Sequence, residues 1–192
     1  MRVGAVHGWE LPHGAEDRPL RTGVLVVGSG VAGLTTAWCL CRSGVPTTIL
    51  TRASLSDSST DWAQGGLAAV WSPEDSTRSH VADTLTAGAG LCEPGPVRAL
   101  AAEAPEALRR LIALGARFDT GPDGGADLHL EGGHSARRIL HAGGDRSGHE
   151  VHRALVAALR GRARLDVRES VRVVDVLTDD EGAALAAGSG IP

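Results

Sequence analysis

Three glycines stand at the spacing that a pyrophosphate-binding turn requires. Gly28, Gly30 and Gly33 occur as GSGVAG, directly after a short apolar run. The first glycine of such a turn permits a sharp bend, the second lets the backbone approach a pyrophosphate, and the third lets a helix pack closely on the preceding strand. The start of that helix offers N–H groups and the positive end of its dipole to phosphate. The turn therefore predicts dinucleotide binding by Gly28, Ser29, Gly30, Val31, Ala32 and Gly33.

The position expected to hold the adenosine ribose lacks its usual acid. An Asp or Glu about 20 residues after the turn commonly binds the ribose hydroxyls. Here the second apolar run ends in Thr51 and Arg52. From the spacing alone, Arg52 reads the 2′-phosphate of NADP, contacts the adenine side of FAD, or is a solvated arginine. The residues by themselves leave these three interpretations open.

The elements that must position this turn form a βαβ unit. A β-branched run at residues 22–27, a helical pattern at 31–43 and a second apolar run at 47–51 predict a strand, a helix and a parallel strand. We expect Cys39 and Cys41, on that helix, to be small buried side chains. The fold class predicted is α/β, Rossmann-like with a parallel sheet. Further helices are expected at 79–87, 96–114 and 148–159, strands at 165–167 and 171–176, and a turn at 179–182, with no strand or helix from Ala183 onward.

Composition excludes several classes of function. The 192 residues carry 19 basic and 23 acidic side chains, a formal charge of −4, and the basic residues are scattered, which argues against nucleic acid as a partner. No apolar run approaches the roughly 20 residues that span a bilayer, so we expect no membrane partner. Three cysteines are too few for a disulfide framework. The five histidines between residues 129 and 152 match no zinc spacing, and no metal site is predicted.

A polar loop provides the first resemblance to a known family. Residues 59–70, STDWAQGGLAAV, resemble the flavin-contacting loop of the succinate dehydrogenase and fumarate reductase flavoprotein superfamily, and within it the aspartate oxidases. The segments that agree in order are residues 75–90 (DSTRSHVADTLTAGAG), 130–135 (LEGGHS) and 138–151 (RILHAGGDRSGHEV). The resemblance implies a Rossmann-like FAD-binding domain that is incomplete, truncated before the family's capping domain. The expected organisation is a disordered tail at 1–21, the N-terminal portion of an FAD-binding domain at 22–182, and a truncated tail at 183–192.

The resemblance also assigns the flavin contacts. Hydroxyl, amide and glycine N–H groups in this loop suit the phosphate, ribitol and ring of a flavin, and the alternative is a solvated turn. In the related dehydrogenases a histidine carries the flavin covalently, whereas the matching residue here, five before Gln64, is Ser59. FAD is therefore expected to bind non-covalently, and Arg52, which matches a basic position of the family, favours FAD over NADP. The flavin-contacting residues implied are Ser59, Thr60, Ala63, Gln64, Gly65 and Gly66.

Glu131 is the most informative candidate for substrate binding. The dicarboxylate dehydrogenases carry an uncharged residue at the matching place, before their Gly-Gly pair, whereas the aspartate oxidases carry Glu. A carboxylate beside a dianionic substrate is unfavourable unless the substrate brings an ammonium group. We predict that Glu131 orients that ammonium; the alternative is that it caps the N–H groups of Gly132 and Gly133. The family resemblance supports a role for His134 and Ser135 in binding a substrate carboxylate.

The function implied is FAD-dependent oxidation of L-aspartate to iminosuccinate, with O2 or fumarate as acceptor. Quinolinate synthase then takes the product in the cytoplasmic route to NAD. Complete family members are over twice this length and carry further substrate-binding residues, so we expect little or no turnover by the chain alone. The alternatives are a fumarate reductase or succinate dehydrogenase flavoprotein, a non-catalytic nucleotide-binding module, one chain of a split enzyme, and a nicotinamide-dependent reductase.

Overall fold

The computed structural model describes residues 22–178 and 184–190, which divide into two compact units. The first unit combines the described residues up to Asp57 with those from Gly161 on, and the second runs from Ser58 to Arg160. The single domain expected at 22–182 thus contains parts of both units. The tail expected at 1–21 and the turn expected at 179–182 lie outside the described residues.

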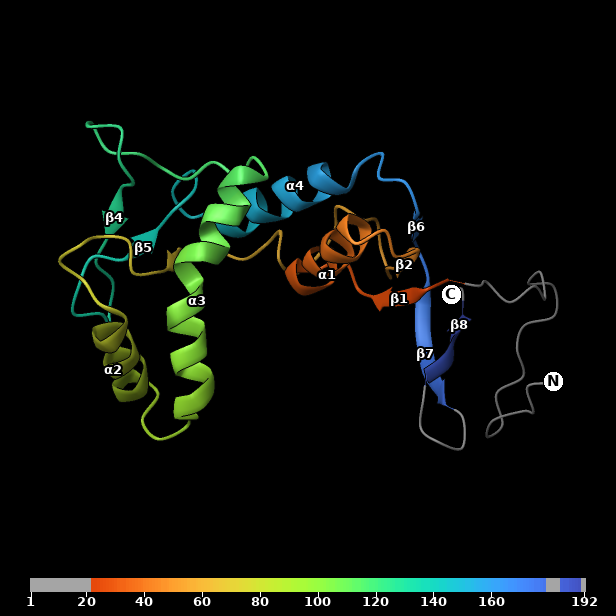
Figure 1. The fold of residues 1–192 in the computed structure, drawn as a ribbon, viewed down its shortest axis with the longest axis horizontal. Coiled ribbons are helices and arrows are strands. Elements are labelled where there is room, and N and C mark those ends of the chain that lie inside the picture. Colours follow the sequence, from red (N-terminus) through yellow and green to blue (C-terminus); the bar gives the residue numbers. More distant parts are fainter. Residues whose placement is uncertain (1–21, 179–183, 191–192) are drawn as a thin grey trace. The chain divides into compact units, whose positions relative to one another are not determined.

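The first unit holds the βαβ motif that surrounds the glycine turn. Strand β1 (Val24–Val27), helix α1 (Val31–Arg42) and strand β2 (Thr47–Leu50) follow one another, and β1 and β2 are parallel. Strand β6 (Leu165–Arg168) adds to the other side of β2, also parallel, so the order is β1-β2-β6. The predicted α/β fold with a parallel sheet is confirmed (Figure 1).

One face of α1 is buried. Leu34 and Ala37 are fully buried, as is Ile49 on β2, so these apolar side chains contribute to the hydrophobic stabilisation of this unit. Cys39 is exposed and Cys41 is half-buried, so the expectation that both are buried was wrong. Residues two apart on a helix point about 200° from one another, and only one side of α1 is covered.

The two glycines that flank the turn are required by the backbone itself. Gly28 has φ +103°, a conformation that side chains with a Cβ rarely adopt. A Cβ on Gly33 would lie 2.1 Å from the carbonyl oxygen of Gly28. The start of α1 therefore touches the end of β1 directly, as the spacing predicts.

The C-terminal part of the chain corrects one prediction. Strand β7 (Arg172–Thr178) pairs antiparallel with strand β8 (Ala184–Gly190), with Val176 opposite Ala187. The expectation that no strand follows Ala183 was wrong. The run ALAAGSG lacks the β-branched and aromatic residues that usually mark a strand, so its extended form depends on pairing with β7 rather than on its own preference.

The second unit combines three helices with a small antiparallel sheet. The strands have the order β3-β5-β4, and helices α2 and α3 pack side by side (Figure 1). Leu140 on β5 is buried with Ala69 and Leu108 in the core of this unit. The elements are β3 (Leu67–Ala68), α2 (Thr77–Ala87), α3 (Pro94–Ala113), β4 (Leu128–His129), β5 (Ile139–Leu140) and α4 (Ser147–Leu159). The three helices predicted in this unit are present, and each begins one or two residues before its expected start.

Among the helices of the described residues, none has both the length and the apolar character needed to cross a bilayer.

Substitution of Gly33 tests the contact between strand and helix. Gly33→Ala places a methyl group against a backbone oxygen that cannot move independently, so we expect a loss of about 1–3 kcal/mol in the free energy of unfolding. Gly132→Ala is the control, because a Cβ there meets nothing within 4 Å apart from its chain neighbours and the φ of Gly132 is not positive. It should change the free energy of unfolding by less than about 1 kcal/mol. Urea unfolding of both variants measures the difference, and equal effects would contradict the close approach at Gly33.

Candidate functional site

The glycine turn lies at the carboxyl end of the parallel sheet. Gly28 donates its N–H to the carbonyl of Leu50 at 2.8 Å, and the buried hydroxyls of Ser29 and Thr51 are 2.8 Å apart. The turn that follows β1 is thereby joined to the residues that follow β2. Arg52, which is exposed, comes next after Thr51 at the same edge of the sheet. The structure thus brings together these two sets of predicted nucleotide-binding residues.

The start of α1 fits a pyrophosphate in chemistry and in shape. Its first turn contains no acidic residue, and a helix N-terminus directs backbone N–H groups outward. Gly30, the residue before the helix, has no side chain to stand between these groups and a ligand. The close approach at Gly33 brings the helix start against the end of β1. Both features meet the requirements of the dinucleotide turn.

In the second unit the polar loop, residues 59–66, packs on the N-terminus of α4. Gly148 donates its N–H to the carbonyl of Ala63 at 3.1 Å, and a Cβ on Gly148 would lie 2.2 Å from the carbonyl oxygen of Thr60. Gln64 donates from Nε2 to Asp145 Oδ2 at 3.2 Å. The loop is therefore held by contacts that only a glycine at position 148 permits.

A surface hollow of about 450 Å³ adjoins the polar loop. Asp61 on its wall lies 2.9 Å from His149 Nδ1 and 3.7 Å from His152 Nδ1. Within the described residues, no group of three or more His, Cys, Asp or Glu side chains is arranged to hold a metal. The hollow is lined by Asp61, Trp62, Ala63, Gln64, Asp145, Arg146 and His149. Two of the predicted flavin-contacting residues, Ala63 and Gln64, thus face an open space.

Glu131 lies close to the end of the polar loop. Its Oε1 is 2.8 Å from Nε2 of His141, and a Cβ added to Gly66 would be 3.0 Å from that same nitrogen. Strand pairing explains this proximity, because β3 follows Gly66, β5 precedes His141, and the two strands are antiparallel. In the part of the chain that the structure describes, the Glu131 carboxylate bonds to His141 and makes no hydrogen bond to the N–H groups of Gly132 or Gly133.

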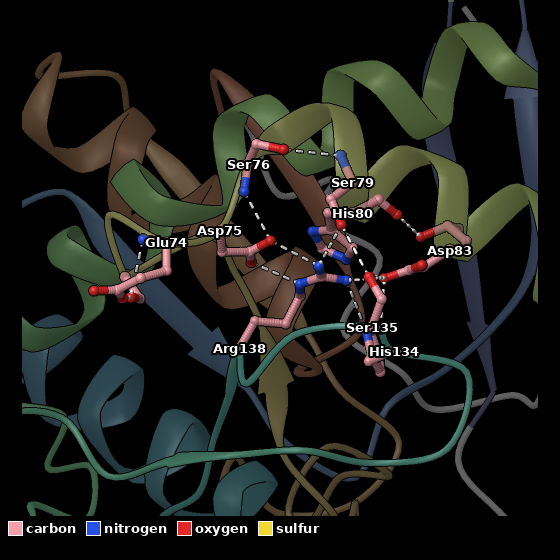
Figure 2. Close-up of polar contacts among 11 residues, drawn as sticks. Glu74, Asp75, Ser76, Ser79, His80, Asp83, His134, Ser135 and Arg138 are labelled. Atoms are coloured by element: carbon pink, nitrogen blue, oxygen red, sulfur yellow. Dashed lines mark hydrogen bonds and ion pairs between the residues drawn. The ribbon is translucent and has the colours of Figure 1, made fainter.

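Arg138 is the centre of a buried ionic cluster (Figure 2). Its side chain is fully buried and donates from Nε and Nη2 to the two carboxylate oxygens of Asp75, both at 2.7 Å. Nη1 donates to Asp83 Oδ2 at 2.6 Å. Two carboxylates thus surround one guanidinium, an arrangement in which each buried charge is paired. The Arg138 cluster comprises Arg138, Asp75, Ser79, Asp83, His134 and Ser135.

The predicted carboxylate-binding residues belong to this cluster. Ser135 donates from its backbone N–H and its hydroxyl to Asp83 Oδ2, each at 2.8 Å. His134 Nδ1 is 3.1 Å from Nη1 of Arg138, a nitrogen that can only donate. His134 and Ser135 are therefore fixed by side chains of helix α2 and by Arg138. Their proposed contact with a substrate remains a prediction.

Hydrogen bonds and burial set the protonation states of the side chains in and beside the Arg138 cluster. Hydrogen bonds from Ser135 and from Arg138 lower the pKa of Asp83 from 3.8 to about 2. The bond from Arg138 likewise lowers the pKa of Asp75 below its ordinary value. Burial, and the nearby Arg138 cation, lower the pKa of His80, whose buried Nδ1 has no hydrogen-bond partner among the described residues. Near neutral pH both carboxylates are therefore ionised and His80 is neutral.

Sequence reasoning missed the Arg138 cluster, although a signal for it exists. Ser79 and Asp83 are four residues apart on α2, which places them on one face, and Asp75 immediately precedes the helix cap Ser76. Two carboxylates on or beside one face of a helix require a cation if that face is buried, but the sequence does not show which arginine supplies it. Only the fold brings Arg138 to them.

The glycine turn at the end of a parallel sheet defines an α/β fold of the dinucleotide-binding class. The chain belongs to the FAD binding domain family, which matches residues 23–188. Its cofactor is FAD, in agreement with the prediction. Particular relatives include the L-aspartate oxidase of Streptomyces coelicolor, 54% identical over 159 residues, which are 83% of this chain and 27% of the relative. A tobacco relative, L-aspartate oxidase 2-b, is 46% identical over 82% of this chain and 24% of its own.

Solved structures show the same fold. Mycobacterium smegmatis Sdh1 in complex with UQ1 superposes with a TM-score of 0.81 at 30% identity, over 88% of this chain and 30% of the other. E. coli quinol fumarate reductase FrdA gives a TM-score of 0.81 at 26% identity, over 88% and 29%. The chain thus spans about a quarter of the length of the curated relatives that it matches.

Removal of the buried cation tests the Arg138 cluster. Arg138→Met leaves Asp75 and Asp83 without their partner, and we expect a loss of about 3–5 kcal/mol in the free energy of unfolding. The neighbouring Arg137 is exposed. Arg137→Met should therefore change stability by less than about 0.5 kcal/mol in the same urea titration. An Arg138→Met variant as stable as the Arg137→Met control would rule out the cluster as a stabilising element.

Proposed function

We propose that the protein carrying this chain is an L-aspartate oxidase that uses FAD. The observation that carries the proposal is the position of Glu131, whose carboxylate lies beside the polar loop at Gly66 and His141. A negative side chain at this place suits a substrate with an ammonium group. The names of the relatives from Streptomyces coelicolor and tobacco support the same substrate.

The reaction removes two electrons and two protons from L-aspartate. The hydrogen on Cα leaves with an electron pair, one proton leaves the amino group, and the C–N single bond becomes the C=N bond of iminosuccinate. When bound, FAD supplies the two-electron acceptor for this step. The electrons pass on to O2, which gives H2O2, or to fumarate, which gives succinate. Residues of this chain bind and orient the reactants.

Two groups of residues hold the cofactor in this proposal. The turn from Gly28 to Gly33 binds the pyrophosphate, with Arg52 toward the adenosine. The polar loop binds the flavin through Ser59, Thr60, Ala63, Gln64, Gly65 and Gly66. Because Ser59 stands where a histidine would carry a covalent flavin, the cofactor is held non-covalently.

The substrate is bound by charges of opposite sign. Glu131 pairs with the ammonium group of L-aspartate, while His134 and Ser135 contact a carboxylate. Hydrogen bonds to Asp83 and Arg138 limit the motion of these two residues. A substrate with two carboxylates and no ammonium would place like charges together at Glu131, at an energetic cost.

A fumarate reductase or succinate dehydrogenase flavoprotein is the second candidate. The structural likeness to Mycobacterium smegmatis Sdh1 and to E. coli FrdA favours it. Glu131 argues against it for the electrostatic reason above. The proposal places the protein in the cytoplasm, with iminosuccinate passed to quinolinate synthase for NAD biosynthesis.

A chimera tests the proposed function. We define the chimera as the full-length Streptomyces coelicolor relative in which the matching segment of this chain replaces its own. We expect yellow protein whose flavin is released by acid, and L-aspartate oxidation that produces H2O2. Glu131→Gln should raise KM for L-aspartate about tenfold or more, because it removes a charged partner. KM for fumarate, which has no ammonium group, should instead fall, because the substitution removes the like charge beside its carboxylates.

Other outcomes identify the alternatives. Flavin retained in the acid pellet, with succinate oxidised in preference to L-aspartate, favours the dehydrogenase function. A flavin-loaded chimera that oxidises neither substrate supports a non-catalytic nucleotide-binding module. The 192-residue chain assayed alone should show little or no turnover, and restoration of turnover by a second polypeptide would favour a split enzyme.

A further inference from the structure

We propose that His141 is a positioning residue that holds the Glu131 carboxylate in the orientation that reads the substrate ammonium. The inference rests on the proposed function and deepens it, because it assigns substrate specificity to a pair of residues. It begins from the contact of 2.8 Å between His141 Nε2 and Glu131 Oε1.

The two partners differ in their freedom to move. The Glu131 side chain is 46% exposed and sits next to two glycines, whereas the His141 side chain is 14% exposed. An exposed glutamate samples several rotamers, and ordering it costs conformational entropy. A bond to a largely buried ring limits that sampling before substrate arrives. His141 therefore lowers the cost of placing the carboxylate.

The ring of His141 is itself held in place. Its Nδ1 is 2.8 Å from the carbonyl oxygen of Gly144 and its Nε2 is 2.8 Å from Glu131 Oε1, and since both oxygens are acceptors, this arrangement has the ring donating from both nitrogens, as the imidazolium form does. Asp119 accepts the N–H groups of Gly143 and Gly144 at 2.9 and 3.1 Å. Both glycines have positive φ, 56° and 79°, a backbone conformation that residues with a Cβ rarely adopt. Asp119 thus fixes the carbonyl that orients the ring.

The same ring lies against the polar loop. The Gly66 backbone leaves no room for a side chain between itself and His141 Nε2. His141 consequently contacts both the predicted flavin-binding loop and the predicted ammonium-binding carboxylate. Among the described residues, Glu131 uses Oε1 for its recorded side-chain bond, which leaves Oε2 for the ammonium.

The test uses the chimera and compares two replacements. His141→Phe keeps a planar ring but has no donor, so we expect KM for L-aspartate to rise about tenfold while KM for fumarate changes less than twofold. His141→Gln retains an N–H donor and should recover most of the affinity for L-aspartate. Asp119→Asn, which weakens the hold on Gly144, should raise KM for L-aspartate by a smaller factor, about threefold.

His129 provides a matched control. Its ring packs edge-on against His141, with centroids 4.8 Å apart, and it pairs with Asp127 rather than with Glu131. His129→Phe keeps this ring contact and should leave KM for L-aspartate unchanged. A structural role of His141 alone would instead lower kcat and flavin content and raise both KM values together.

The outcomes separate the two proposals. If the unsubstituted chimera does not oxidise L-aspartate, the proposed function itself fails. If it does, and His141→Phe keeps its KM for L-aspartate, or changes KM for both ligands equally, the role of His141 is wrong. If His141→Phe does not fold, the comparison passes to His141→Gln and Asp119→Asn. An unchanged KM for L-aspartate in Asp119→Asn overturns the role of His141. A rise in KM for L-aspartate that is not matched by a rise in KM for fumarate supports it.

Discussion

One buried guanidinium constrains the half of the chain that carries the candidate substrate residues. Arg138 is fully enclosed and is paired with Asp75 and Asp83 on and beside helix α2. Because an unpaired charge in the interior is costly, this arrangement ties the segment from Glu131 to Arg138 to that helix. The positions of His134 and Ser135 depend on the same constraint, since each side chain bonds to a member of the cluster. The precision expected at the substrate site depends on an ionic contact that does not touch the substrate.

Glycines supply the second constraint, because they allow backbone segments to approach one another. Gly33 brings helix α1 against the end of β1, Gly66 brings the polar loop against His141, and Gly148 brings helix α4 against the same loop. At each position a Cβ would collide with a backbone or ring atom. In each unit these contacts bring polar backbone against a neighbouring element without an intervening side chain. Such close approach explains why polar loops without regular secondary structure are fixed in this chain.

Much of the fold could be predicted from local pattern, since the glycine turn between apolar runs specifies a βαβ unit and each amphipathic run specifies its helix. The position of Gly28 and the contact between Ser29 and Thr51 follow from the parallel sheet. Strand β8 could not be predicted, because its small residues have no strand preference and depend on β7. The pairs made by Arg138 and by His141 were also missed, since each joins residues whose proximity depends on the pairing of β3, β4 and β5. The glycine turn could thus be predicted from residue types and spacing, and the candidate flavin and substrate residues from the family resemblance, whereas the contacts among them could be predicted from neither.

The central claim is that a carboxylate of this chain reads the ammonium group of an amino-acid substrate beside the flavin. The most direct measurement is a crystal structure of the FAD-loaded chimera with L-aspartate bound. The account predicts that the substrate nitrogen lies about 3 Å from Oε2 of Glu131, with Oε1 still on His141 and the flavin against Gln64, Gly65 and Gly66. A substrate whose nitrogen points away from Glu131, or a flavin bound away from the polar loop, would contradict it.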